Sequence, residues 1–257
     1  MLERRVSEGV TFLVAKAMES AGFSVAFTER SGGTSTGPYR SLNLGLRDGD
    51  ESQQVLENRR RACRALDVPS FACAQQVHGT HRVRIGPKRA GAGYMDRDEA
   101  VPGTDCLVTA SRGVAVAVMT ADCVPIALGD PVNGTIAVVH AGWRGIARGV
   151  LASALSAFPE PSRLKAAIGP AVGPDHYEVG EDVALAVGMA SEGGAVTERH
   201  GSRINLDLPG TVARVLRERG VRSIERAREC TACERARFFS YRRDGETGRQ
   251  ALVAVRL

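Results

Sequence analysis

Short runs of apolar residues along the chain are separated by polar and glycine-rich stretches, and their spacing predicts the secondary structure. Residues 114–119 and 135–139 are continuously β-branched or apolar, which is typical of strands buried on both faces. Shorter runs at residues 24–28, 164–168 and 251–257 have the composition of further strands. The pattern therefore predicts a β-sheet with buried strands.

Apolar residues at helical spacing predict helices at residues 50–66, 146–158, 181–189 and 208–219. In the first of these, Asp50 is the expected N-terminal cap, and Val55, Leu56 and Cys63 are expected on the buried face. Gly220 directly follows the last helix and is a typical C-terminal stop.

Strands and helices alternate only in part along the chain, so a simple doubly wound sheet is not expected. We predict an α/β fold with α+β character, in which a layered mixed β-sheet is flanked by helices. No Pro/Ser-rich linker, charge block or internal repeat divides the sequence, so residues 1–257 are expected to form a single domain. The glycines on either side of Trp143 and Arg144 do not have the spacing of a dinucleotide-binding loop.

Composition and charge narrow the class of protein further. The chain has 257 residues, of which 43% are hydrophobic and 25% are charged, as in ordinary globular proteins. No apolar stretch approaches the length of a membrane helix, and the start lacks the apolar core of a secretory signal. The net charge of +5 comes from arginines scattered among acidic residues, which is typical of solvated surfaces. We therefore expect a cytoplasmic protein, a monomer or homodimer, that binds neither membranes nor nucleic acid.

Three segments each offer one side chain of a kind that binds metal ions. They are Gln76-Val77-His78-Gly79, Thr120-Ala121-Asp122-Cys123 and His140-Ala141-Gly142-Trp143-Arg144-Gly145. Cys123 follows one predicted buried strand and His140 ends the other, so two neighbouring strands could deliver both to the same edge of one sheet. His78, also beside an apolar position, could add a third ligand. Two histidines and a cysteine with the fourth position open form a plausible catalytic zinc set.

These segments belong to a longer series that resembles a known family. The series includes Ala26-Phe27-Thr28-Glu29-Arg30-Ser31-Gly32-Gly33, Gly37-Pro38-Tyr39-Arg40-Ser41-Leu42-Asn43-Leu44-Gly45, Glu57-Asn58-Arg59-Arg60, Ile168-Gly169-Pro170, Tyr177-Glu178-Val179-Gly180 and Phe238-Phe239-Ser240-Tyr241-Arg242-Arg243-Asp244-Gly245. Each segment is short, but all of them in this order are highly specific. The sequence resembles the bacterial YfiH/YlmD family, also called the laccase-domain or multicopper polyphenol oxidase family, over nearly the whole chain.

The resemblance implies both a fold and a function. The fold would be YfiH-like, and the function would be phosphorolysis of adenosine, inosine and S-methyl-5'-thioadenosine by a purine nucleoside phosphorylase that also deaminates adenosine. The resemblance assigns the metal to His78, Cys123 and His140, with zinc expected and copper as the alternative. Because they would bind the metal where the reaction takes place, Cys123 and His140 are also expected to be catalytic.

Further residues are candidates for substrate contact or proton transfer. Asp122 could carry a proton or anchor an imidazole, or it could cap the end of a strand. Arg144 and Arg242 could bind phosphate, since a guanidinium group binds it through paired hydrogen bonds, or they could form surface ion pairs. Asn43 could bond a sugar hydroxyl or hold a turn, and the resemblance favours the site.

Other functions could use the same residues. Two histidines and a cysteine also suit a copper-dependent, laccase-like polyphenol oxidase, with Met119 as a conceivable axial ligand. A multicopper cluster needs many histidines, however, and this chain has 5. In a metal-free hydrolase, Cys123 would be the nucleophile and His140 its base. A protein that stores metal or binds a partner is the non-enzymatic alternative.

Two of the 6 cysteines, Cys230 and Cys233, have the separation found in some metal and redox sites. One such pair is at most half of a structural zinc site. We interpret both as ordinary thiols, which the cytoplasm keeps reduced. The resemblance makes Cys230 and Thr231 a recurring pair and gives Cys233 no role.

Overall fold

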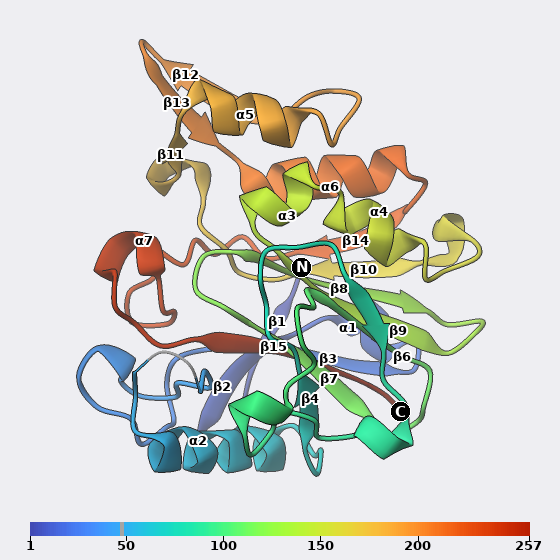
Figure 1. The fold of residues 1–257 in the computed structure, drawn as a ribbon, viewed down its shortest axis with the longest axis vertical. Coiled ribbons are helices and arrows are strands. Elements are labelled where there is room, and N and C mark those ends of the chain that lie inside the picture. The colour runs from blue at the N-terminus through green and yellow to red at the C-terminus, as the bar shows by residue number, and fades with distance from the viewer. Residues whose placement is uncertain (47–48) are drawn as a thin grey trace.

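The computed structural model describes residues 1–46 and 49–257, and in this part of the chain the strands form two six-stranded sheets and a three-stranded one (Figure 1). The order in the first sheet is β1 (Glu3–Ser7), β2 (Val10–Val14), β3 (Phe23–Thr28), β15 (Gln250–Arg256), β7 (Ala115–Thr120) and β4 (Phe71–Cys73). The order in the second sheet is β14 (Ser223–Arg226), β10 (Lys165–Ile168), β8 (Val124–Asp130), β9 (Thr135–Ala141), β6 (Cys106–Thr109) and β5 (Arg82–Arg84). The small sheet has the order β11 (Glu178–Val179), β13 (Arg203–Leu206) and β12 (Thr197–His200).

Helices cover the outer faces of the two large sheets (Figure 1). The helices are α1 (Lys16–Glu19), α2 (Ser52–Ala65), α3 (Trp143–Ala147), α4 (Val150–Leu155), α5 (Glu181–Gly188), α6 (Leu208–Glu218) and α7 (Tyr241–Asp244). Helix α2 packs on the first sheet, and α3, α4 and α6 pack on the second. The layers therefore run helix, sheet, sheet, helix, and each layer buries one apolar face against the next.

The middle of the protein lies between the two large sheets. Leu13, Phe27 and Leu252 of the first sheet share one hydrophobic cluster with Ala127 and Val138 of the second sheet. Neighbouring side chains along a strand point to opposite faces, so strands between two layers must be apolar at every position. This requirement explains the continuous apolar runs that identified β7 and β9 in the sequence.

The strands predicted from the sequence are confirmed as β3, β7, β9, β10 and β15. Both large sheets mix parallel with antiparallel pairs, which confirms the predicted α/β class with a mixed sheet. The most important strand that the sequence analysis missed is β8. Pro125 and Gly129 interrupt its apolar run, and both residues are normally depleted in strands. In the structure β8 is nevertheless central to the second sheet and fully buried.

The predicted helices are also found, with two corrections. The segment 146–158 is not one helix, because Gly149 adopts a left-handed conformation (φ 94°) between α3 and α4. Helix α2 begins at Ser52, and Asp50 does not cap it, since Glu51 occupies that position. Asp50 instead accepts hydrogen bonds from the side chains of Ser35 and Asn43.

The predicted buried face of α2 is partly confirmed. Val55 and Cys63 are buried, whereas Leu56 is only half-buried. The polar Arg59 lies in the core instead, where its guanidinium group donates to backbone carbonyl groups of the loops that α2 supports.

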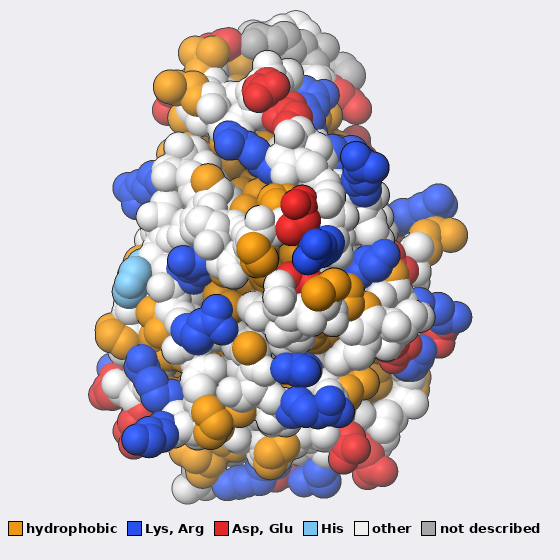
Figure 2. Space-filling model, turned by 90° about the vertical axis from the view of Figure 1, so that its right-hand side faces the viewer, with side chains coloured by type: hydrophobic (Ala, Val, Ile, Leu, Met, Phe, Trp, Pro, Cys, Tyr) orange, Lys and Arg blue, Asp and Glu red, His pale blue; other side chains and the backbone are white. Residues whose placement is uncertain are grey.

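No helix in the described ranges is both long and apolar enough to cross a membrane. On the face shown in Figure 2, lysines and arginines lie scattered among acidic and hydrophobic side chains. This distribution agrees with the mixed charge pattern of the sequence.

Candidate active site

The sulfur and one imidazole of the site come from neighbouring strands of the second sheet. Cys123 directly precedes β8, His140 lies near the end of β9, and the antiparallel register pairs Val124 with Ala141. Both side chains therefore meet at one edge of one sheet, as predicted. The strand that brings Cys123 to this edge is β8, however, because β7 belongs to the other sheet.

His78 reaches the same place from the loop between β4 and β5. The side-chain amide of Gln76 holds this loop on β7, donating to the Met119 carbonyl (2.7 Å) and accepting from the Met119 N–H (2.8 Å). His78 has a left-handed backbone with φ 56°. Such a conformation costs a non-glycine residue about 1 kcal/mol or more and is concentrated at functional sites. The loop is thus held by specific contacts in a shape that presents this imidazole.

The three side chains are close enough to share one metal ion. The ligand atoms of His78, Cys123 and His140 all lie within 4.8 Å of one another. Cys123 Sγ is 3.6 Å from His78 Nε2, and a tetrahedral zinc ion with ordinary bond lengths separates sulfur from nitrogen by about 3.5 Å. A Cβ atom on Gly142 would lie 2.6 Å from His78 Cδ2, so glycine keeps the space open. Among the side chains that the structure describes, this is the one group of three that could hold a metal ion.

Asp105, which the sequence analysis missed, connects the two histidines. Its Oδ1 bonds His140 Nδ1 at 2.7 Å, which leaves His140 Nε2 for a metal ion. The same carboxylate accepts the backbone N–H groups of Val77, His78 and Gly79 at 2.7–3.1 Å. A carboxylate behind a ligand histidine fixes its ring orientation and tautomer. The available signal was an acidic residue directly before the apolar strand β6.

Cys123 and His140 form a charged pair when no metal is bound. Burial raises the pKa of the Cys123 thiol, but the charge of His140 and hydrogen bonds from both histidines outweigh it and lower the pKa to about 6. Burial lowers the pKa of His140, but Cys123 and Asp105 raise it to about 9. The lowered pKa of Cys123 favours the thiolate, which is the form that binds metal, and a metal ion would displace the imidazole proton.

The ligand group opens into a cleft of about 780 Å³, a volume typical of small-molecule sites. Its walls come from both large sheets, from the start of α3 and from the segment around α7, and they include Arg97, Met119, Thr120, Trp143, Tyr241 and Arg249. The metal-ligand group therefore lies where a molecule of nucleoside size can reach it.

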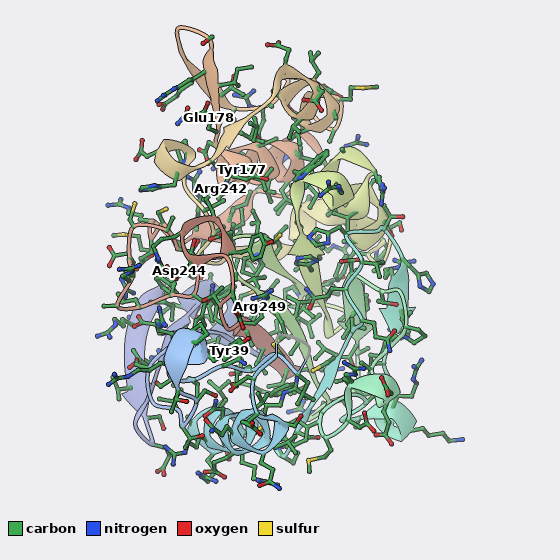
Figure 3. The ribbon with its side chains drawn as sticks, turned by 60° about the vertical axis from the view of Figure 1, so that its left-hand side comes forward. Tyr39, Tyr177, Glu178, Arg242, Asp244 and Arg249 are labelled. Carbon is green, nitrogen blue, oxygen red and sulfur yellow. The ribbon has the colours of Figure 1, made fainter. Side chains whose placement is uncertain are left out.

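Two guanidinium groups lie on aromatic rings beside the cleft. Arg144 is 4.4 Å from the Trp143 ring centre, and Arg242 is 5.0 Å from that of Tyr177. Arg242 also donates to the Glu178 carbonyl (3.2 Å), and Figure 3 shows Tyr177, Glu178 and Arg242 together. Burial raises the pKa of Tyr177 to about 12, so its phenol stays neutral. The arrangement places the positive charge of both guanidinium groups in the lining of the cleft, and guanidinium groups are suited to binding anions.

Asp122 connects the cysteine loop to the C-terminal segment. Its Oδ1 accepts a hydrogen bond from the Thr231 hydroxyl and its Oδ2 accepts one from the Arg242 N–H, both at 2.6 Å. Its backbone is left-handed, with φ 93°. Of the roles predicted for Asp122, the imidazole anchor belongs to Asp105 instead. These contacts place Arg242 next to the Cys123 loop.

Asn43 lies beside the cleft but does not line it. Its side chain is fully buried, and its amide donates to the Gly45 carbonyl and to Asp50. Its Oδ1 accepts the N–H groups of Gly45 and Arg249 at 3.0 and 2.8 Å. These four bonds use the whole amide, so the predicted contact with a sugar hydroxyl is replaced by the turn-holding role. Through that turn Asn43 fixes the backbone of Arg249, which does line the cleft.

Comparison with known proteins extends these observations. The family described as multi-copper polyphenol oxidoreductase laccase matches residues 24–256. A purine nucleoside phosphorylase of Deinococcus radiodurans is 41% identical over 235 residues, which cover 89% of this chain and 87% of that protein. The purine nucleoside phosphorylase YfiH of Escherichia coli (strain K12) is 36% identical over 247 residues, 93% of this chain and 96% of that protein.

The fold is also similar to solved structures. The crystal structure of YlmD from Geobacillus stearothermophilus matches with a TM-score of 0.91 at 36% identity, and the match covers 98% of this chain and 97% of that one. A YfiH structure from Bacillus licheniformis matches with a TM-score of 0.90 at 29% identity, over 98% of each chain. The YfiH-like fold expected from the sequence is confirmed.

Proposed function

This chain belongs to the multi-copper polyphenol oxidoreductase laccase family, and we propose that it is a zinc-dependent purine nucleoside phosphorylase. The proposed substrates are adenosine, inosine and S-methyl-5'-thioadenosine, which inorganic phosphate cleaves in the cytoplasm. Deamination of adenosine is the proposed second activity. The names of the two relatives at 41% and 36% identity support the reaction class, since both are purine nucleoside phosphorylases.

The main support for the proposal is that a possible metal-ligand set and two arginine side chains line the same cleft. His78, Cys123 and His140 lie at one place in its lining, and Arg144 and Arg242 lie in the same lining. Phosphorolysis needs a phosphate anion held next to the sugar carbon that it attacks, and a metal ion in the same cleft could polarise an oxygen of that phosphate. A purely metal-storing protein would need neither the guanidinium groups nor the open cleft.

The proposed metal ligands are the imidazoles of His78 and His140 and the thiolate of Cys123. When bound, zinc would supply a Lewis acid that polarises an oxygen of phosphate or water. Asp105 keeps the His140 ring in place and holds the loop that carries His78. The contacts of Asp105 thus hold the ligand side chains in position before substrate binds.

We propose that Arg144 and Arg242 bind the phosphate. The rings of Trp143 and Tyr177 support the two guanidinium groups from one side, which leaves N–H donors for phosphate oxygens. In the reaction a phosphate oxygen forms a bond to the sugar carbon C1′, and the bond from C1′ to the purine nitrogen breaks. The purine leaves with the electron pair and takes up a proton. Asp122, which lines the cleft, is the proposed carrier of that proton or the residue that positions Arg242.

Product analysis on metal-quantified protein tests the proposal. The protein is incubated with adenosine in the presence and absence of phosphate, and adenine, inosine and ribose 1-phosphate are separated by chromatography. We expect adenine and ribose 1-phosphate to form together, only with phosphate, and neither to form after treatment with a chelator. Inosine that forms without phosphate would establish the deaminase activity. Absence of every product from zinc-loaded protein would reject the nucleoside function.

A cysteine hydrolase is the second candidate, because the lowered pKa of Cys123 beside His140 also describes an activated nucleophile. The two candidates differ in what the metal-free protein does. A hydrolase stays active without metal and loses its activity when an alkylating reagent modifies Cys123. A zinc enzyme is inactive without metal, and bound zinc protects the same sulfur from alkylation.

Copper is the alternative metal, in keeping with the family's description. A copper enzyme of the laccase type would consume oxygen with a phenolic substrate. Elemental analysis of the purified protein, followed by an oxygen-uptake assay with either metal, separates the two possibilities. We expect the purified protein to contain zinc and to consume no oxygen with a phenolic substrate.

A further inference from the structure

The proposed reaction does not use the turn formed by Cys230-Thr231-Ala232-Cys233, and the geometry of this turn brings its two thiols together. The Glu234 N–H donates to the Cys230 carbonyl at 3.0 Å, which closes one helical turn. Side chains three positions apart lie on the same side of such a turn. Cys233 is exposed and Cys230 is partly exposed, so small molecules in solution can reach this pair.

We propose that Cys230 and Cys233 are a redox-active dithiol, which a low-molecular-weight disulfide oxidises to an intramolecular disulfide bond. In the first step the Cys230 thiolate attacks one sulfur of the small disulfide, forms a mixed disulfide and releases one small thiol. In the second step Cys233 loses its proton and attacks Cys230 Sγ, which releases the second small thiol. The protein loses two electrons and two protons, and the small disulfide becomes two thiols.

The surroundings of the two sulfurs assign these roles. Cys230 Sγ accepts the Gly173 N–H at 3.1 Å, so a backbone donor faces the sulfur assigned to the first attack. Burial of its sulfur and a hydrogen bond with Cys230 raise the pKa of Cys233 to about 11, so this thiol stays protonated until the mixed disulfide forms next to it.

The other cysteines are poor competitors for the same reagent. Cys63, Cys73 and Cys106 are buried, and burial raises the pKa of each thiol. Cys123 lies in the metal-ligand group, where a bound metal ion would occupy its sulfur. In metal-loaded protein the surface pair is therefore the accessible dithiol.

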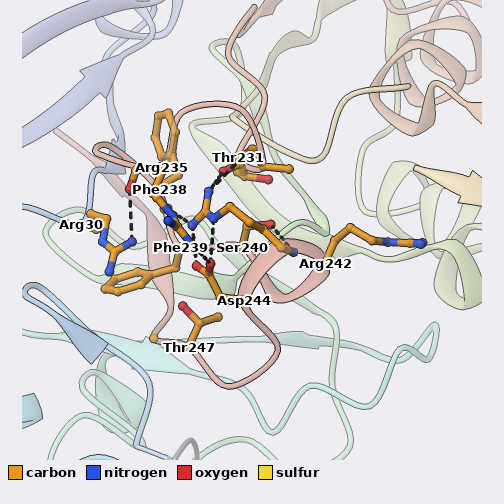
Figure 4. Close-up of polar contacts among 12 residues, drawn as sticks. Arg30, Thr231, Arg235, Phe238, Phe239, Ser240, Arg242, Asp244 and Thr247 are labelled. Carbon is orange, nitrogen blue, oxygen red and sulfur yellow. Dashed lines mark hydrogen bonds and ion pairs between the residues drawn. The ribbon is translucent and has the colours of Figure 1, made fainter. Parts of the chain in front are cut away.

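The turn is also in direct contact with the cleft. The Thr231 hydroxyl donates to Asp122, the neighbour of Cys123, at 2.6 Å. Arg243 holds the backbone of the same turn by donating to the carbonyls of Thr231 and Ala232 at 2.8 and 3.1 Å (Figure 4). A disulfide between Cys230 and Cys233 would therefore close a small ring that contains Thr231, and the Thr231 hydroxyl is hydrogen-bonded to the loop that carries Cys123. The proposed dithiol chemistry stands independently of the reaction proposed for the cleft.

Peptide mapping of the metal-loaded protein tests this proposal. The protein is incubated with oxidised glutathione, remaining thiols are blocked, and trypsin cleavage after Arg228 and Arg235 then isolates both cysteines in peptide 229–235. We expect this peptide to lose the mass of two hydrogen atoms and to recover it after treatment with dithiothreitol. In a Cys233→Ser variant the reaction should stop at a glutathione adduct on Cys230.

Two results would overturn the proposal, and neither depends on a variant. One is that peptide 229–235 of the folded protein stays reduced or carries glutathione on both cysteines, while the unfolded chain forms the internal bond under the same conditions. That result would mean that the folded turn keeps the sulfurs apart. The other is an internal bond that dithiothreitol does not reduce in the folded protein.

Discussion

At the scale of single residues, the placement of the metal ligands depends on one carboxylate that binds no metal itself. Asp105 bonds the His140 ring and three backbone N–H groups of the His78 loop, so two ligands from distant parts of the chain share one support. The sequence pattern identified His78, Cys123 and His140 because each stands beside an apolar run or in a recognised motif. It could not identify Asp105, whose role depends on a loop that folds back on it from more than twenty positions away.

Replacing Asp105 by Asn should weaken metal binding without unfolding the protein. An amide oxygen can still accept the N–H groups of the His78 loop, but an uncharged group supports the His140 imidazole less strongly. We expect a 10- to 100-fold loss of zinc affinity, measured by competition with a chelating dye. Asp98→Asn, which changes an exposed carboxylate, is the control with unchanged affinity. An unchanged affinity in the Asp105 variant would contradict the assigned support.

An Asp122→Asn variant distinguishes the two roles proposed for this residue. If Asp122 positions Arg242, loss of its charge should raise the KM for phosphate about tenfold with a smaller change in kcat. If it carries the proton, kcat should fall about 100-fold or more while the KM for phosphate stays the same. The two hydrogen bonds that Asp122 already accepts lead us to expect the first result. Steady-state kinetics with varied phosphate measures it.

At the scale of elements, the strands and helices that the sequence predicted have a clear apolar pattern, but shorter buried strands such as β2 and β6 were not predicted. The sequence analysis also missed β8, because Pro125 and Gly129 lie within it, and it joined α3 and α4 into one helix. In both cases tertiary structure overrides a local signal. Pro125 is tolerated because it is the second residue of β8, next to Gly169, which lies just beyond the end of β10, so few ladder hydrogen bonds are lost there. Gly149 allows the chain to change direction between two short helices.

Gly149→Ala should destabilise the protein through backbone conformation alone. Gly149 has φ 94°, and an added Cβ atom would meet no other atom within 4 Å, so strain is the only new cost. We expect a loss of about 1 kcal/mol in the free energy of unfolding, measured by urea denaturation. Gly149→Asn is the matched comparison and should lose less, since Asn tolerates this conformation better. Equal stability of Gly149→Ala and the wild type would contradict the left-handed turn.

At the scale of the whole molecule, strands from both ends of the chain lie in one sheet. The C-terminal strand β15 lies between β3 and β7 and is hydrogen-bonded to both. The cleft likewise takes side chains from the first quarter of the chain and from its last tenth, such as Arg59 and Arg249. We therefore propose that residues 1–257 form one domain. Circular dichroism and tryptophan fluorescence should then report coincident unfolding transitions.

Glu29 links the two ends of the chain and should make their association sensitive to acid. Its side chain is 1% exposed and pairs with Arg4 and Arg237. Burial raises its pKa, but the hydrogen bonds from these arginines outweigh burial and lower the pKa below its usual value. The contribution of the Glu29 charge to the free energy of unfolding is complete above the unfolded pKa of about 4.3. This contribution is lost as the pH falls through the lower pKa of the folded state.

Glu29→Gln should therefore cost about 1–3 kcal/mol at neutral pH, and the difference from the wild type should shrink in acid below about pH 4. Denaturation curves measured at several pH values test this, with the exposed Glu99→Gln as a control. A stability difference that does not depend on pH would show that the charge of Glu29 is not what matters.

The central claim is that His78, Cys123 and His140 hold a metal ion on which nucleoside phosphorolysis depends. It is tested most directly by titrating zinc into metal-free protein while phosphate-dependent release of adenine from adenosine is measured in the same samples. We expect activity to rise in proportion to added zinc and to stop rising at one zinc per chain, and we expect Cys123→Ala to show neither tight zinc binding nor activity. Full activity of the metal-free protein, or one tightly bound zinc in the Cys123→Ala variant, would contradict it.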